Sequence, residues 1–203
     1  MKKQTKYGII FACIILVICG FWYKDYQAKE AVRLAVASET VIEEVSPLLT
    51  YEELQVEMDK AINNNPNRNK TINLMPASDS TNQYRIFTQR LFISDKYQPA
   101  ITFYCQTTEE DVKKAIDKII YIDFDRNYEG RSKAFHGDIF VNLESPNDIY
   151  YIVNGDFYDS GNTLETGTKQ VALNQSIEIK YQIENKPGSK YGYKCLEHRF
   201  TFE

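Results

Sequence analysis

The second half of the chain is dominated by short segments of the kind that form β-strands. From Gln83 onward, seven segments are rich in Ile, Val, Phe, Tyr and Thr, and several alternate apolar with polar residues. Their sequences are YRIFTQRLFI, AITFYCQ, IIYIDFD, AFHGDIFVNL, DIYYIVNGDFY, QSIEIKYQIE and YKCLEHRFTFE. Turn signals at Asn154, at Ser160 and from Lys186 separate the later segments at intervals that suit an antiparallel meander. The pattern predicts a mostly antiparallel, β-rich domain over residues 83–203.

One stretch between these segments, TTEEDVKKAIDKI, has the periodicity of a helix. Thr107 or Thr108 could cap its beginning. Four apolar residues would then share one helical face: Val112, Ala115, Ile116 and Ile119. We therefore expect one short helix inserted among the strands.

The residues before the strands favour helices. No Gly or Pro interrupts residues 24–46, and small or apolar residues step by three and four along one helical face. These residues are Ala31, Leu34, Ser38, Val41, Val45 and Leu48. We expect a long N-terminal helix that ends or kinks at Pro47. The face of this helix that carries these residues would pack on the protein's own sheet or on a neighbour's equivalent helix.

A second, shorter helix is predicted further along. Thr50 and Glu53 have the spacing of a capping box, and apolar residues then recur at every fourth position from Leu54. This helix should run from about Tyr51 to Ile62.

The helical segment would thus cover residues 24–62, and a polar, proline-broken loop would follow at residues 63–82. The predicted fold class is α+β. It consists of a long N-terminal helix, a second short helix, and a mostly antiparallel β-sheet with one inserted helix.

The N-terminus carries an apolar run with the borders of a membrane segment. Three lysines precede an uncharged stretch over residues 7–23, which as a helix would span about 26 Å. Tyr7, Trp22 and Tyr23 suit the headgroup level at its two ends. We predict a transmembrane signal-anchor helix, with a cleaved signal peptide and a buried core helix as the alternatives.

This interpretation also predicts where the chain works. Basic residues stay on the cytoplasmic side, so residues 1–6 would be a cytoplasmic tail. The bulk of the chain would be extracytoplasmic, in the periplasm, after a single pass through the bacterial inner (cytoplasmic) membrane. The formal net charge of −4 argues against nucleic acid as a partner.

Two cysteines, Cys105 and Cys195, lie outside the apolar run. An even pair in an oxidising compartment suggests a disulfide, and two buried free thiols are the alternative.

The stretch YKDYQAKEAVRLAVAS, from Tyr23 to Ser38, resembles the part of type IV pilins in which the long helix leaves the membrane. The shared features are a Tyr-x-Asp-Tyr-x-Ala motif followed by spaced Val and Ala. The resemblance implies a helix that is half in the membrane and half packed on an antiparallel sheet. It also implies a disulfide near the C-terminus, where Cys195 lies. The resemblance is partial, and it includes no prepilin processing site.

Few residues offer material for catalysis or metal binding. Asp123, Asp125 and Asn127 alternate as in a calcium loop, but Tyr128 stands where such a loop needs Gly.

The two histidines, His136 and His198, have no metal-ligand spacing. His136 with Asp138, and His198 with Glu197, are conceivable acid–base pairs, and outward strand positions are the simpler interpretation. We predict no catalytic residue, no metal ligand and no cofactor.

Tyrosine is the compositional exception, with 15 residues. Tyr joins apolar area to a polar tip and is favoured at binding surfaces, although strand propensity also explains its use. The candidate binding surface consists of Tyr150, Tyr151, Tyr158, Tyr191 and Tyr193. Because strand residues alternate, only one of Tyr150 and Tyr151 can join it.

The leading functional hypothesis is a non-enzymatic, single-pass envelope protein. Its extracytoplasmic domain would bind another protein, or a second copy of itself, as an assembly component or an inhibitor. A pilin-like structural subunit and an enzyme of unrecognised type are the alternatives.

Overall fold

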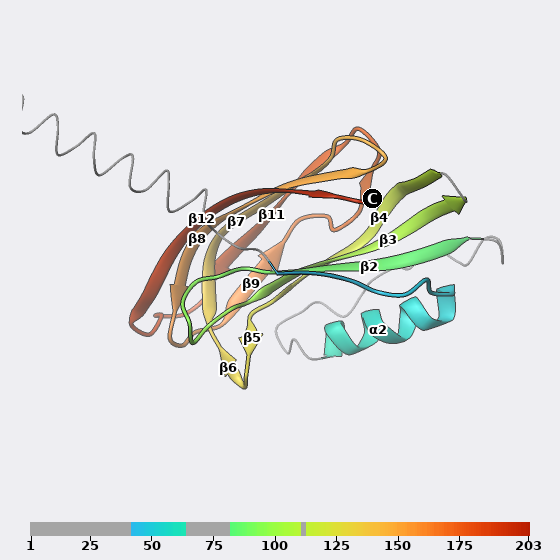
Figure 1. Ribbon diagram of the computed structural model, residues 1–203. Helices are drawn as coiled ribbons and strands as arrows, with labels where there is room; N and C mark the ends of the chain where they lie inside the picture. Colours follow the sequence, from blue (N-terminus) through green and yellow to red (C-terminus); the bar gives the residue numbers. More distant parts are fainter. Residues whose placement is uncertain (1–41, 64–81, 111–112) are drawn as a thin grey trace, which may run out of the picture. The chain divides into compact units, whose positions relative to one another are not determined.

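The computed structural model describes residues 42–63, 82–110 and 113–203, which form most of one compact unit (Figure 1). Of these residues, 63% lie in strands and 9% in a helix. The described part of the chain is therefore mostly β, and the predicted α+β class with a long helix is wrong for it.

Two five-stranded antiparallel sheets make up the fold (Figure 1). The first sheet contains, in spatial order, β1 (Ile42–Val45), β2 (Gln83–Arg90), β3 (Ala100–Glu110), β4 (Lys113–Asp125) and β10 (Val171–Ala172). The second sheet contains β12 (Lys190–Thr201), β8 (Asp148–Tyr158), β7 (Ala134–Leu143), β11 (Ser176–Ile183) and β9 (Thr163–Thr166). A small hairpin of β5 (Asn127–Tyr128) and β6 (Arg131–Ser132) connects one sheet to the other.

The main core lies between the two sheets. Along β8, residues alternate strictly between buried and less buried positions, so every second side chain faces the first sheet. Ring contacts cross the gap, with centroids 5.5 Å apart for Phe103 and Tyr151, and 4.7 Å apart for Phe87 and Phe200. Each such fully buried ring stabilises the fold by about 1.5–3 kcal/mol. The arrangement is a β-sandwich.

Helix α2 (Tyr51–Asn63) covers the outer face of the first sheet (Figure 1). Leu54 and Met58 are fully buried there against tyrosines of β2, β3 and β4. The predicted capping box is present: the Glu53 backbone N–H donates to Thr50 Oγ1 at 3.3 Å, and the Thr50 N–H donates to the Glu53 carboxylate at 2.8 Å. The prediction of this helix, with its start, is confirmed.

The predicted long helix is wrong where the structure describes it. Residues 42–45 form β1, which pairs with residues 87–90 of β2. Ser46 extends this connection, because its hydroxyl accepts the Ile86 N–H at 2.9 Å. Ile42 and Val45 fit a strand as well as a helix, and pairing with β2 decides the outcome. The remainder of the predicted helix lies outside the described residues.

The predicted inserted helix is also wrong, because its residues belong to β3 and β4. Glu109 pairs with Lys114, and Glu110 with Lys113, so opposite charges face each other across the hairpin. The register shifts twice, and each shift adds one residue to β4. The bulge at Asp117, between Ile116 and Ile119, brings these two side chains to the same buried face, which imitates helical spacing.

The described part of the structure gives no support to the predicted membrane anchor or to the localisation that follows from it. In the parts of the chain that are described, no helix is long and apolar enough to cross a membrane. Helix α2 has 13 residues, about 20 Å in length, and its outward side is mostly polar. Residues 7–23, with Tyr7, Trp22 and Tyr23, lie outside the described residues.

Candidate functional site

The two cysteines predicted to pair are free thiols. Cys105 on β3 is fully buried in the core, and burial raises the pKa of its thiol. Cys195 lies exposed on β12, opposite Asn154. The disulfide prediction is wrong, because one thiol faces the core from the first sheet while the other faces outward on the second sheet.

The candidate tyrosines divide between the two faces of the second sheet. Tyr150 and Tyr151 point to opposite faces of β8, and Tyr151 is fully buried. Tyr191 packs edge-on against Tyr97, with centroids 5.6 Å apart, and its hydroxyl lies 2.7 Å from the Ser94 hydroxyl. Tyr151 and Tyr191 therefore belong to the core side.

The other three tyrosines lie on the outer face of the second sheet. Tyr150 and Tyr158 alternate outward along β8, and Tyr193 on the neighbouring β12 is 59% exposed. Phe140 of β7 contacts Tyr150 with ring centroids 6.2 Å apart. Ile152 is half-buried between the ends of this row. We call these five side chains the tyrosine face.

Charged and polar groups hold the tyrosines in place. The Tyr193 hydroxyl donates to Asn154 Oδ1 at 2.8 Å, and the Arg199 guanidinium lies 6.0 Å from the Tyr150 ring centre. A hydrogen bond with Glu197, together with burial, raises the pKa of Tyr150, so its phenol is neutral at pH 7.

The outer face of the second sheet also carries both signs of charge next to the tyrosines. Lys190 forms an ion pair with Asp156 at 2.7 Å, and hydrogen bonding to Asp156 raises the pKa of Lys190. Arg199 pairs with Glu144, also at 2.7 Å. Lys194 is half-buried on the opposite side of β12, and burial lowers its pKa.

The two histidines lie in different surroundings. His136 is exposed on β7. His198 does not use Glu197; its Nε2 lies 3.0 Å from Glu43 Oε1 of β1. The two side chains are 26% and 41% exposed, and they connect the edges of the two sheets. This contact explains His198 as a structural residue.

The segment with Asp123, Asp125 and Asn127 consists of the end of β4 and a turn. Asp125 Oδ1 accepts the Asn127 backbone N–H at 2.9 Å, and Asp123 is buried on β4. Within residues 42–63, 82–110 and 113–203, no group of His, Cys, Asp or Glu side chains could hold a metal ion.

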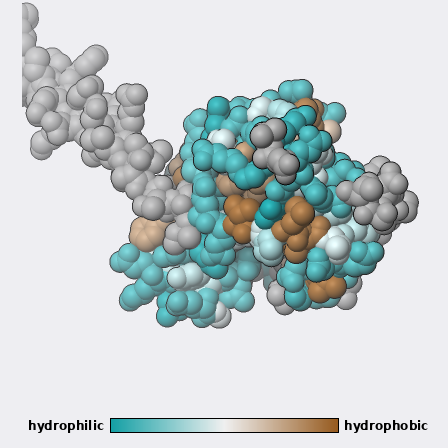
Figure 2. All heavy atoms as spheres, turned by 45° about the vertical axis from the view of Figure 1, so that its right-hand side comes forward, coloured by the Kyte–Doolittle hydropathy of each residue, from teal (hydrophilic) through white to brown (hydrophobic). Residues whose placement is uncertain are grey.

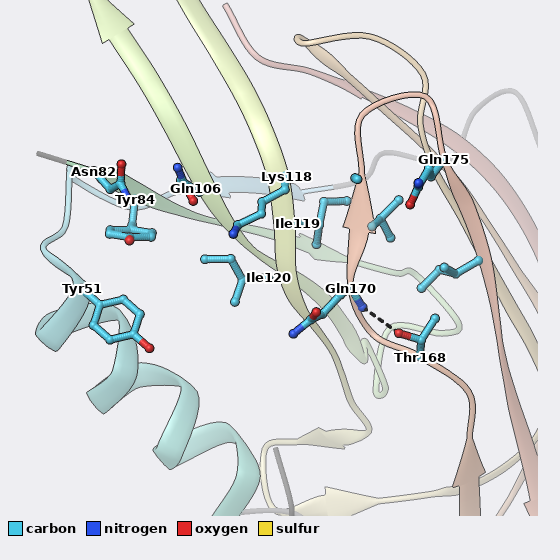
Figure 3. A pocket seen from close by; sticks show the side chains of 13 residues that line it. Tyr51, Asn82, Tyr84, Gln106, Lys118, Ile119, Ile120, Thr168, Gln170 and Gln175 are labelled. Carbon is cyan, nitrogen blue, oxygen red and sulfur yellow. Dashed lines mark hydrogen bonds between the residues drawn. The ribbon is translucent and has the colours of Figure 1, made fainter. Parts of the chain in front are cut away.

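A cavity of about 690 Å³ lies beside the N-terminal end of α2, a volume typical of small-molecule sites (Figure 3). Its wall includes Tyr51 of α2, Tyr84 of β2, Gln106 of β3, Lys118 and Ile120 of β4, and Gln170 of the β9–β10 connection. In Figure 3, Lys118 and Ile120 extend toward the side on which Tyr84 lies, and Gln170 enters from the opposite side.

No pattern in the sequence marks this cavity. Its wall comes from separate segments between residues 51 and 177, and no two of its amide side chains are neighbours in the chain. Figure 2 shows a face of the molecule on which hydrophilic side chains surround small groups of hydrophobic ones. The tyrosine face and the cavity share no residue, so they are two separate candidate sites.

No protein-family model, no curated protein and no solved structure matches this chain. The geometry of the two candidate sites therefore carries the functional argument. The resemblance to pilins rests on residues 23–38, outside the described residues, and stays a prediction.

Proposed function

We propose that this chain is a non-enzymatic binding protein and that another protein docks on the tyrosine face. The observation that carries the proposal is the outward position of Tyr150, Tyr158 and Tyr193 on two adjacent strands. Tyr and Arg are enriched among the few residues that dominate binding energy at protein interfaces, and Arg199 lies next to Tyr150.

The two sheets differ in how their outer faces are used. Helix α2 covers the first sheet and buries Leu54 and Met58 against it. No element among the described residues covers the outer face of the second sheet in the same way. Aromatic side chains on that face can therefore meet a partner.

The dimensions of the tyrosine face suit a protein interface. Tyr150 and Tyr158 are eight residues apart on β8, which corresponds to about 26 Å. A standard interface buries about 800 Å² on each partner, a patch roughly 30 Å across. Tyrosines lie at both ends of this row, and Ile152, Asn154 and Asp156 face outward between them, so the face combines aromatic anchors with polar and charged groups, as protein interfaces commonly do.

Site-specific photo-cross-linking tests the proposal. A benzophenone amino acid replaces Tyr193 in the full chain, and a matched control carries it at Val56, which is 53% exposed on α2. After irradiation in cells, mass spectrometry identifies the adducts. We expect one partner protein at position 193 that is absent at position 56. Equal adducts at both positions, or none at position 193, would overturn the proposal, and adducts to the chain itself would indicate self-association.

A further inference from the structure

We propose that the cavity beside α2 binds a saccharide that carries a carboxylate. This inference is independent of the tyrosine face, because the two sites share no residue. It rests on three properties of the cavity wall: its charge, its amide groups and its aromatic surface.

The first property is the presence of one cation in the wall and of no acidic side chain. Lys118 lies on β4 between the two bulged positions, and it is half-buried. Within the described residues, the Lys118 ammonium makes no ion pair and no hydrogen bond. A partly desolvated cation without a partner favours an anionic group, and a single lysine matches a single carboxylate.

The second property is the abundance of amides. Gln106, Gln170 and Gln175 contribute side chains to the wall, and in the described part of the chain these three amides have no hydrogen-bond partner. An amide offers an acceptor and two donors in one plane. A sugar hydroxyl both donates and accepts, so adjacent hydroxyls match these groups.

The third property is an aromatic and aliphatic surface on one side. The rings of Tyr51 and Tyr84 lie 5.7 Å apart and are tilted by 51°, and Ile120 lies in the same cluster. Burial raises the pKa of Tyr84, so its phenol is neutral and can donate. Such a surface packs against the C–H face of a sugar ring.

Other ligand classes fit this wall less well. A fatty carboxylate would satisfy Lys118 but would desolvate the three glutamine amides without partners, at a cost of about 1–3 kcal/mol each. A neutral saccharide would satisfy the amides and leave the ammonium without a partner. A multiply charged phosphate ligand would need more than one cation.

Titration calorimetry on the full chain tests the inference with five probes. Three carry a single carboxylate on a sugar: galacturonate, a hyaluronan disaccharide and sialyllactose. Maltotetraose and decanoate serve as the neutral and the apolar comparison. We expect at least one acidic saccharide to bind, and more tightly than maltotetraose and decanoate.

The Lys118→Met variant keeps the apolar stem and removes the charge, and we expect it to bind the acidic saccharide at least tenfold more weakly. Lys113→Met, at an exposed position on the same strand, is the matched control and should bind as the wild type does. Melting curves show whether each variant is folded. If Lys118→Met does not fold, Gln106→Leu takes its place in the binding test. Binding of decanoate alone, equal binding of maltotetraose, an unchanged affinity in the folded variant, or no binding of any acidic saccharide would overturn the inference.

Discussion

At the scale of single residues, Arg85 connects three strands of the first sheet. Its Nε and Nη2 donate to the two carboxylate oxygens of Glu109 at 2.7 and 2.8 Å, and its Nη1 donates to the Ser46 carbonyl at 2.6 Å. The Arg85 and Glu109 side chains are 21% and 13% exposed, so solvent screens this bidentate pair only partly. The pair holds the end of β1 against β2 and β3.

We predict that Glu109→Gln makes the protein less stable at pH 7 and less sensitive to acid. Hydrogen bonding to Arg85 lowers the pKa of Glu109, so the carboxylate stabilises the fold above the usual Glu pKa. That stability is lost as the pH falls through the lowered pKa. We expect the substitution to lower the free energy of unfolding at pH 7 by about 1–3 kcal/mol, as measured by urea unfolding.

The same unfolding series between about pH 7 and pH 3 supplies the control. Glu110→Gln changes the exposed neighbouring residue and should leave the pH dependence as in the wild type. A Glu109→Gln protein with the wild-type pH profile would contradict the role given to this pair.

At the scale of elements, local signals predicted some parts of the fold and long-range pairing decided others. Helix α2 could be predicted because its capping box and four-residue spacing are local. The β3–β4 hairpin could not be predicted, because the bulge that places Ile116 and Ile119 on one face exists only in the paired strands. Strand β1 is likewise defined by its pairing with β2.

We predict that Met58→Ala lowers the free energy of unfolding by about 2–4 kcal/mol, because the side chain is fully buried between α2 and the first sheet. Val56→Ala, at a 53% exposed position of the same helix, should change it by less than about 0.5 kcal/mol. Chemical denaturation measures both values. Equal effects of the two substitutions would show that α2 does not pack on the sheet as described.

At the scale of the whole unit, the fold presents one covered and one open sheet face, and the candidate sites follow from this asymmetry. Strand alternation predicted from the sequence that Tyr150 and Tyr151 lie on opposite faces, but not which of them faces the core. The cavity could not be predicted, because its wall is assembled from α2, both sheets and the β9–β10 connection. The disulfide prediction was wrong for a related reason, because the sequence does not reveal that Cys105 faces the core.

The most direct test of the protein-binding claim measures the affinity of the partner identified by cross-linking for the full chain and two variants. We predict that replacing both Tyr150 and Tyr193 by Ala weakens binding at least tenfold, about 1.4 kcal/mol or more. Both side chains lie on the outer face, so the double variant should keep the wild-type melting temperature. Val56→Ala, on the helix side, should bind as the wild type does. Unchanged affinity in the folded double variant would contradict the proposal that the tyrosine face is the docking surface.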